Sequence, residues 1–172
     1  MKVAVTGGTG FVGKAIVREL VSRGHEVSLL VRNVPGPGSP LLDGVRFVQG
    51  NVVTGDGLAE LAEGQDALIH LVGIIRESAA NTFDAVHRRG SENAVRSAEE
   101  AGVGRYLHMS ALGTREDAAS EYHRTKWAGE KAVRASGLEW TVFRPSIVFG
   151  PEDSFINMLA DLMKKSPVMP VF

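Results

Sequence analysis

Residues 6–13 read Thr-Gly-Gly-Thr-Gly-Phe-Val-Gly and join a β-branched run to a helical pattern. The preceding run, Lys2-Val3-Ala4-Val5-Thr6, is short and largely apolar, which is typical of a buried strand. From Phe11 to Val21 the apolar residues recur at helical intervals, which predicts an amphipathic helix that Gly24 closes. The stretch therefore predicts a strand, a tight glycine loop and a helix, in that order.

The glycines of this loop are spaced for phosphate binding. Gly7, Gly10 and Gly13 follow a G-x-x-G-x-x-G pattern. In a strand–loop–helix unit the first glycine permits a tight turn, the second lets the backbone approach a pyrophosphate, and the third lets helix and strand pack closely. The amino end of the helix adds unpaired N–H groups and a positive dipole end. The alternative is a tight turn without a ligand, but we predict dinucleotide binding by Gly7, Thr9, Gly10, Phe11, Val12 and Gly13.

The rest of the chain continues the alternation of strands and helices. Further apolar, β-rich runs predict strands over 27–31, 45–48, 67–72, 106–109 and 139–143. Helical spacing predicts helices over 58–61, 81–101, 121–136 and 154–165, and the prolines and glycines of 35–40 predict a loop. Strands that alternate with helices favour an α/β fold with a doubly wound parallel sheet, the Rossmann fold, here as one domain over 1–172.

Composition narrows the function classes. The chain has 172 residues, 44% hydrophobic and 23% charged, as ordinary globular proteins have. Its 19 basic and 20 acidic side chains leave no positive surplus for nucleic acid. The absence of cysteine excludes a disulfide framework and a cysteine nucleophile, and no apolar run is long enough to span a membrane. We expect a soluble, cytoplasmic protein.

The remaining polar residues suggest no metal site. No pair of His, Asp or Glu has metal-ligand spacing. His70 and His108 lie in apolar strands, and we expect both to be hydrogen-bonded core residues.

Arg32 bears on which dinucleotide binds. It stands nineteen residues after Gly13, at the end of the second predicted strand, where no Asp or Glu occurs. A carboxylate at this place usually takes the ribose hydroxyls of NAD, whereas an arginine suits the 2′-phosphate of NADP. The alternative is a solvated surface arginine. We predict NADP(H) in preference to NAD(H).

Ser110, Tyr122 and Lys126 suggest catalysis. Ser110 follows the fifth predicted strand, at the sheet edge where doubly wound folds bind ligands. Tyr122 and Lys126 are four residues apart on a predicted helix and share a face. A nearby ammonium would lower the pKa of the tyrosine from about 10. Tyr122 could then exchange a proton with a substrate oxygen, with Ser110 hydrogen-bonded to the carbonyl and Lys126 also holding the nicotinamide ribose. Tyr-x-x-x-Lys by itself more often marks a half-exposed helix face.

With these motifs the sequence resembles the short-chain dehydrogenase/reductase superfamily, in its extended or atypical branch. The resemblance runs along the whole chain. Within the superfamily it is most similar to nucleotide-sugar epimerase-like proteins and to the nucleotide-binding accessory subunit of respiratory complex I. It rests on residues 6–13, on Ile69-His70-Leu71-Val72-Gly73, on Ser110-Ala111-Leu112-Gly113, on Tyr122-His123-Arg124-Thr125-Lys126, and on residues 144–151, Arg-Pro-Ser-Ile-Val-Phe-Gly-Pro.

The resemblance implies further site residues. Leu71, Val72 and Gly73 would line the cofactor, and Pro145 and Ser146 would approach the nicotinamide. Many relatives meet the adenine with an Asp after the third strand. Here Asn51 stands there, and its amide can still hydrogen-bond.

Relatives also continue past this length with a part that closes over the substrate. We therefore expect residues 151–172 to begin a truncated substrate-binding segment. The apolar face of the last predicted helix and the apolar run 168–172 suggest that this end is covered by more chain, by a second copy or by a larger assembly.

These features predict an NADP(H)-dependent oxidoreductase or epimerase-like enzyme that acts on a small hydroxyl or carbonyl substrate, such as a nucleotide sugar. Two alternatives remain open. One is a non-catalytic NADP(H)-binding subunit of a respiratory complex, and the other is a regulator that senses the ratio of NADP+ to NADPH.

Overall fold

The computed structural model describes residues 1–36, 44–79, 81–153 and 155–165, and within them the chain forms one parallel six-stranded sheet. The strand order is β3-β2-β1-β4-β5-β6. In chain order the strands are β1 Lys2–Thr6, β2 Glu26–Val31, β3 Val45–Gln49, β4 Ala67–His70, β5 Arg105–Met109 and β6 Glu139–Phe143. The predicted Rossmann fold is confirmed.

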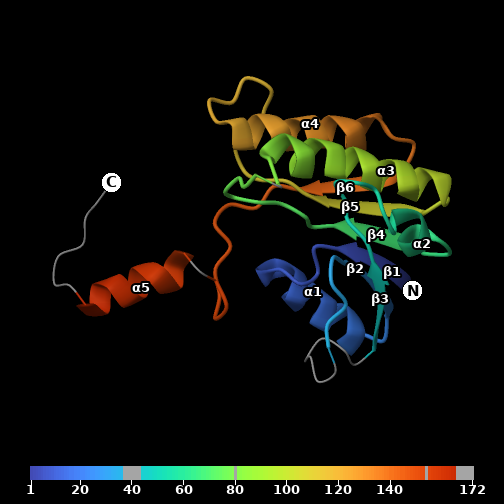
Figure 1. Ribbon diagram of the computed structural model, residues 1–172, viewed down its shortest axis with the longest axis horizontal. Coiled ribbons are helices and arrows are strands. Elements are labelled where there is room, and N and C mark those ends of the chain that lie inside the picture. The colour runs from blue at the N-terminus through green and yellow to red at the C-terminus, as the bar shows by residue number, and fades with distance from the viewer. Residues whose placement is uncertain (37–43, 80, 154, 166–172) are drawn as a thin grey trace.

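Helices cover both faces of the sheet (Figure 1). One face carries α1, and the other carries α2, α3 and α4. A π-helical stretch, η1, leads directly into α3. The helices are α1 Phe11–Ser22, α2 Leu58–Ala62, η1 Asp84–Arg89, α3 Gly90–Glu100, α4 Glu121–Ala135 and α5 Phe155–Lys165.

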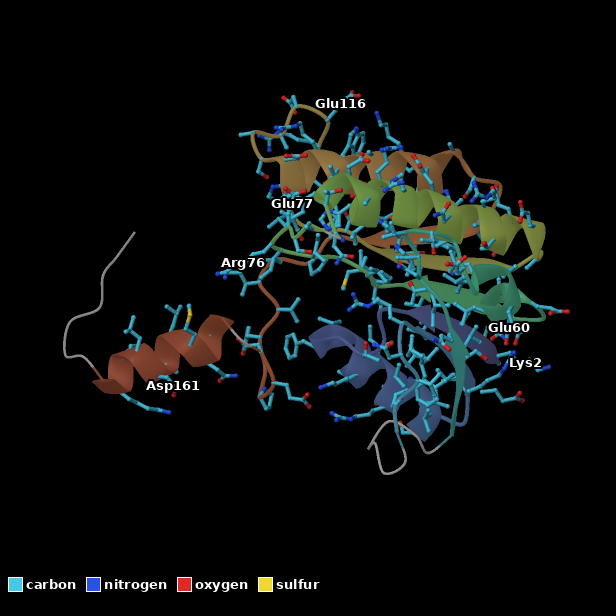
Figure 2. The ribbon with its side chains drawn as sticks, in the orientation of Figure 1. Lys2, Glu60, Arg76, Glu77, Glu116 and Asp161 are labelled. Carbon is cyan, nitrogen blue, oxygen red and sulfur yellow. The ribbon has the colours of Figure 1, made fainter. Side chains whose placement is uncertain are left out.

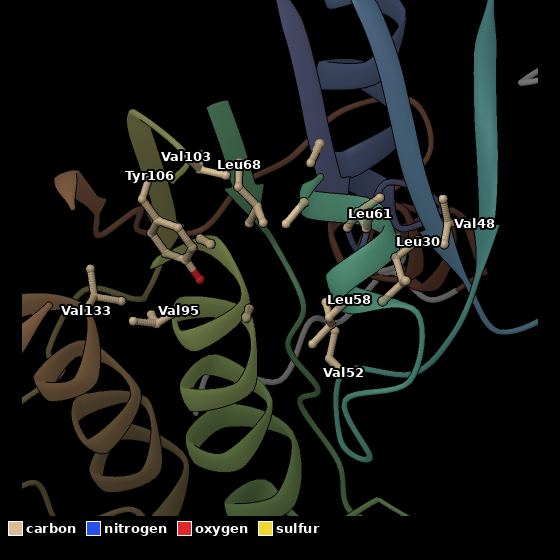
Figure 3. Close-up of a cluster of buried hydrophobic side chains, with 14 residues drawn as sticks. Leu30, Val48, Val52, Leu58, Leu61, Leu68, Val95, Val103, Tyr106 and Val133 are labelled. Carbon is tan, nitrogen blue, oxygen red and sulfur yellow. The ribbon is translucent and has the colours of Figure 1, made fainter. Parts of the chain in front are cut away.

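The core consists of two apolar layers, one on each face. On the α1 face, Val17 packs with alternate residues of the strands, among them Val5 and Leu29. On the other face, Leu58 and Leu61 of α2 pack with Val95 of α3 and with further strand residues (Figure 3). Because both faces are covered, the central strands are apolar on both sides, which explains why they read as continuous apolar runs.

The strand and helix boundaries follow the sequence expectations closely, with two differences. β4 ends at His70, although the apolar run continues to Val72. Its neighbour β1 stops at Thr6, whose carbonyl still accepts from the Leu71 N–H at 3.0 Å, and the backbone then turns at Gly7, so the segment from Val72 onward has no strand to pair with on that side. The helix predicted over 81–101 begins with η1 at Asp84 and ends at Glu100. Much of the loop predicted over 35–40 lies outside the described residues.

The strand order places a crevice at the carboxyl ends of β1 and β4. Chain connections leave β1 and β4 in opposite directions across the sheet, and ligands of doubly wound folds bind at such a point. Figure 2 shows Arg76 and Glu77 on the loop after β4, at the edge of the sheet opposite Lys2 and Glu60. The segments that follow β1, β4, β5 and β6 all meet at this carboxyl edge.

Helix α5 lies beyond this edge, apart from the other helices (Figure 1). Its Met158, Leu162 and Met163 are exposed. In the described part of the chain no helix is long and apolar enough to cross a membrane. The prediction that residues 151–172 begin a further segment stays a prediction.

Candidate active site

The glycine loop after β1 has the tight geometry that its spacing predicts. Gly7 has a φ of 78°, which side-chain-bearing residues rarely adopt, and a Cβ there would lie 2.9 Å from the backbone of Leu71 and Val72. The Gly10 N–H donates to the Gly7 carbonyl at 3.1 Å. A Cβ at Gly13 would collide with the Gly7 carbonyl oxygen and lie 2.6 Å from the Gly8 Cα. The loop, β1 and α1 are therefore packed backbone to backbone.

The amino end of α1 suits an anion. The N-cap is Gly10, which has no side chain to act as a cap, and the first turn of this helix has no acidic residue. Gly10 and Phe11, the first helical residue, both line the pocket described next. The free N–H groups of the first turn and the glycines of the loop fit a dinucleotide pyrophosphate.

A pocket of about 420 Å³ joins this loop to the predicted catalytic residues. The predicted site residues that line it are Gly7, Gly10, Phe11, Val12, Gly13, Leu71, Gly73, Ser110, Tyr122, Lys126, Pro145 and Ser146. Segments that are far apart in the sequence thus meet at the carboxyl edge of the sheet.

Four of the predicted cofactor residues do not line this pocket. Thr9 is exposed on the loop, and Val72 packs against the core on the α3 face. Arg32 is exposed just after β2, where its carbonyl accepts a 3.4 Å hydrogen bond from Gln49. The side-chain oxygen of Asn51 accepts from the N–H of Val53 at 2.9 Å and so holds its own turn.

Ser110 and Tyr122 reach the pocket from different elements. Ser110 directly follows β5, is buried, and lies 3.3 Å from the hydroxyl of Thr114. Tyr122 stands in the first turn of α4, where the Ser120 side chain caps the helix by accepting from the His123 N–H. Burial raises the pKa of Tyr122, in the direction opposite to the lowering that a neighbouring ammonium would cause.

Lys126 is a buried polar residue of the pocket. Its side chain is buried, and Nζ donates to the Met109 carbonyl at 3.0 Å. Burial lowers the pKa of Lys126 to about 8, although the charge of Glu130 acts in the opposite direction. A Cβ at Gly73 would lie 2.9 Å from Nζ, so the glycine leaves room for the lysine.

His87 belongs to the site, although sequence reasoning did not select it. It lies in η1, and π-helical stretches often occur at functional sites. Its ring contacts the Tyr122 ring edge-on at 5.1 Å between centroids, its Nδ1 lies 3.0 Å from the Thr125 hydroxyl, and its Nε2 lies 3.1 Å from the backbone of Ile74. Burial, with a smaller effect of Lys126, lowers the pKa of His87 to about 4, so the ring is neutral. An irregular helical turn of this kind leaves no periodic signal in the sequence.

Two further buried histidines lie beside this site. His70 and His108 stack at 5.5 Å between ring centroids. His70 is within hydrogen-bond distance of the hydroxyls of Thr6 and Ser91, at 2.7 and 3.3 Å, as expected of a core histidine. His108 departs from the expectation, because neither ring nitrogen has a hydrogen-bond partner among the described residues. Burial is the main cause that lowers the pKa of His70, and lowers that of His108 to about 3.

Comparison with known proteins agrees with this geometry. Residues 7–159 match the model of a family described as NAD(P)H-binding. The chain is 37% identical to a ceramide reductase of Caulobacter vibrioides over 98% of its length and 53% of that protein. It is 29% identical to the mouse mitochondrial protein named NADH dehydrogenase [ubiquinone] 1 alpha subcomplex subunit 9, over 91% of this chain and 43% of that one. The chain thus spans about half the length of these relatives.

Solved structures show the same fold with a nicotinamide dinucleotide bound. A short-chain dehydrogenase/reductase superfamily protein of Agrobacterium tumefaciens with bound NAD is 27% identical, with a TM-score of 0.68 over 84% of this chain and 48% of that one. The Bordetella bronchiseptica enzyme WbmH in complex with NAD+ superposes with a TM-score of 0.79 at 22% identity, over 95% and 62% of the two chains.

Proposed function

The chain belongs to the NAD(P)H-binding family of short-chain dehydrogenase/reductase type, and from that premise we propose that it is an NADP(H)-dependent oxidoreductase of a hydroxyl or carbonyl substrate. One observation carries the proposal. A single pocket is lined both by the glycine loop at the amino end of α1 and by Ser110, Tyr122 and Lys126. A protein that only held the cofactor could use Lys126 for the ribose but would have no need of a proton donor or of Ser110 beside it.

In the proposed reaction each residue has a distinct task. The N–H groups at the start of α1 hold the pyrophosphate. When bound, the cofactor supplies or accepts a hydride at its nicotinamide. Tyr122 transfers the proton between its hydroxyl and the substrate oxygen. Lys126 holds the nicotinamide ribose, and its positive charge offsets the cost of burying a tyrosinate.

Ser110 would steady the same substrate oxygen. A hydroxyl has one hydrogen to donate, and that of Ser110 lies within reach of Thr114 on the protein side. Rotation about its C–O bond is enough to direct the hydrogen toward a carbonyl, because a hydroxyl rotor turns freely.

Arg32 supports NADP(H) as the preferred cofactor. It is exposed at the end of β2, free to meet a phosphate, and its neighbours in sequence are Val31 and Asn33, which carry no negative charge. The 2′-phosphate of NADP would gain charge-assisted hydrogen bonds there, whereas the ribose diol of NAD would lack an acidic acceptor.

The substrate class is proposed from the pocket mouth and from a relative's name. Ile75 and Val148 line the pocket and are 78% and 44% exposed, so one part of the mouth is apolar, beside the exposed carboxylate of Glu152. Ceramide reductase, the name of the relative that is 37% identical, places a long-chain lipid carbonyl first among the compounds to test. A nucleotide sugar is the second.

A non-catalytic role as a cofactor-binding subunit is the alternative that a specific comparison favours. The similarity to the mitochondrial NADH dehydrogenase subunit supports it. The two proposals agree on cofactor binding and differ on turnover.

The test measures binding first and turnover second. NADPH and NADH are titrated into the protein by calorimetry, and the NADPH complex is then mixed with a ketone analogue of ceramide or with a keto sugar nucleotide. Loss of NADPH absorbance in the wild type and its absence in Tyr122→Phe support the enzyme. Tight binding without oxidation by either class favours the binding subunit, and the absence of binding contradicts both.

A further inference from the structure

Glu130 is a fully buried carboxylate, one helical turn beyond Lys126 on α4. Arg144 donates two hydrogen bonds to it, from Nε to Oε1 at 2.8 Å and from Nη2 to Oε2 at 2.6 Å. Arg134 donates a third, from Nη2 to Oε2 at 3.4 Å. A buried ionised carboxylate is costly unless it is paired and hydrogen-bonded on several sides, and this one is.

Through Arg144, Glu130 is connected to one wall of the pocket. Arg144 immediately precedes Pro145 and Ser146, which line the pocket, so the ion pair fixes where that segment lies. The Leu112 N–H also donates to the Pro145 carbonyl at 2.9 Å, which joins the same segment to the loop after β5. Glu130 does not itself line the pocket.

Glu130 is ionised in this position. Burial opposes its ionisation, but the hydrogen bonds from Arg144 outweigh burial and hold the pKa of this carboxyl below its usual value. The ion pair between Glu130 and Arg144 therefore carries both of its charges.

The second connection is to Lys126, which lies one helical turn before Glu130 on α4 and on which Glu130 acts through its charge. The ammonium is faced by His70 from β4, His87 from η1 and His108 from β5, and on α4 by Tyr122 and Glu130. The histidines are neutral above about pH 6, because burial lowers the pKa of each. Glu130 is the group in this set whose charge favours the ammonium form.

We propose that Glu130 is a positioning residue of the active site, which fixes the segment from Arg144 to Ser146 against α4 and so aligns it with Lys126, one helical turn away. The catalytic use of this arrangement rests on the proposed function, whereas the positioning of the residues by Glu130 does not depend on it. A purely structural role would be different, since the ion pair with Arg144 would then hold the fold together without affecting Lys126.

The direction in which the pKa of Lys126 changes in Glu130→Gln distinguishes a positioning role of Glu130 from a purely structural one. The chain is labelled with 13C at the lysine Cε, and Lys126 is titrated by NMR without cofactor, in the wild type and in Glu130→Gln. Removal of the negative charge from an intact site lowers the pKa of Lys126 below the wild-type value of about 8, by roughly one unit or more. If Glu130 is only structural, its loss lets water reach the lysine, and the pKa rises toward about 10.4.

Cofactor affinity is the second measurement, with a matched control. Glu130→Gln weakens NADPH binding roughly tenfold or more, because the walls of the pocket are no longer aligned. Glu116→Gln removes an exposed carboxylate outside α4 that pairs at 3.2 Å with Lys131 of α4. It should leave the pKa of Lys126 and the affinity for NADPH unchanged.

If Glu130→Gln does not fold, Glu130→Asp tests the proposal, because aspartate keeps the charge but is too short to reach Arg144 in the same way. Lys126 then titrates as in the wild type, while NADPH binds more weakly. A pKa and an affinity both unchanged in the variant that folds, or a raised pKa in Glu130→Gln, would overturn the proposal. A wild type that binds no cofactor contradicts the proposed function instead, and the lysine titration still stands.

Discussion

At the scale of single residues, Tyr122 carries the proposed proton transfer. Tyr122→Phe should reduce turnover of a substrate by about 10²–10⁴-fold, the usual contribution of general acid–base catalysis. NADPH affinity should hardly change, because the hydroxyl acts on the substrate. Steady-state kinetics and calorimetry measure the two effects separately.

The chain supplies a matched control for this substitution. Tyr106 is fully buried in the core, and its hydroxyl has no hydrogen-bond partner among the described residues. Tyr106→Phe removes the same atom from a place where it makes no bond, so activity should be retained. Wild-type turnover by Tyr122→Phe would reject the assignment of the acid/base.

Arg32 sets the cofactor preference in the proposal. Hydrogen bonds to charged groups contribute about 1.5–3 kcal/mol, which corresponds to NADPH binding roughly 10- to 150-fold more tightly than NADH. The preference should shrink as salt rises, because Arg32 is exposed. Arg32→Asp should reverse it, by removing the partner and adding a repelling charge. Calorimetric titration of both reduced cofactors measures the change, and equal wild-type affinities would show Arg32 to be a surface charge only.

At the scale of elements, the loop between β1 and α1 is packed closely against neighbouring backbone. Gly13→Ala should destabilise the protein by about 3 kcal/mol, at the upper end of the usual cost of overpacking, because the new Cβ meets backbone atoms on both sides of the turn. Dinucleotide binding should be lost with it. Urea unfolding and calorimetry measure both. Gly36→Ala is the control, since a Cβ there meets no atom of the described residues within 4 Å, and an equal loss in both variants would contradict the packing argument.

The elements themselves could be predicted from the sequence because each carries a local signal. Short apolar runs located the six strands that the structure describes, and the glycine spacing located the dinucleotide loop. The end of β4 could not be predicted, because it depends on where β1 turns away. The hydrogen bond from the Val53 N–H to Asn51 could not be predicted either, because it depends on the path of the turn.

The parts of the site that the sequence did not reveal depend on long-range contacts. His87 reaches Tyr122 because η1 departs from regular helical geometry, and Glu130 acquires its role only when Arg144 is brought to it from the end of β6. Neither residue lies in a motif whose spacing predicts the contact.

At the scale of the whole molecule, three buried histidines predict sensitivity to acid. The unfolded chain protonates histidine below about pH 6.5, whereas burial lowers the pKa of His87 to about 4 and of His108 to about 3 in the folded chain. Their neutral state therefore contributes stability that is fully present above about pH 6.5 and is lost as the pH falls toward these values. Each such histidine changes the free energy of unfolding by about 1.4 kcal/mol per pH unit.

His108→Leu isolates one of these histidines. Leucine is apolar and needs no partner for ring nitrogens, so the variant should lose less stability in acid, by about 1.4 kcal/mol per pH unit between pH ~5.5 and ~4. Urea unfolding across this range measures the slope. His25→Gln, at the amino-terminal edge, keeps all three buried histidines and should keep the wild-type slope. A wild-type slope in His108→Leu would mean that His108 is not held neutral in the folded protein.

The strand order also affects the chain while it is being synthesised. β1 is made first, yet it is a central strand, and its second neighbour pairs Val3 with Ala67, far along the chain. Until β4 has left the ribosome, one edge of β1 is open, and open strand edges can pair with other chains. The glycine loop is incomplete over the same interval, because Gly7 packs against Leu71 and Val72. Cofactor in the cell therefore cannot stabilise this amino-terminal part of the sheet until the fourth strand has been made.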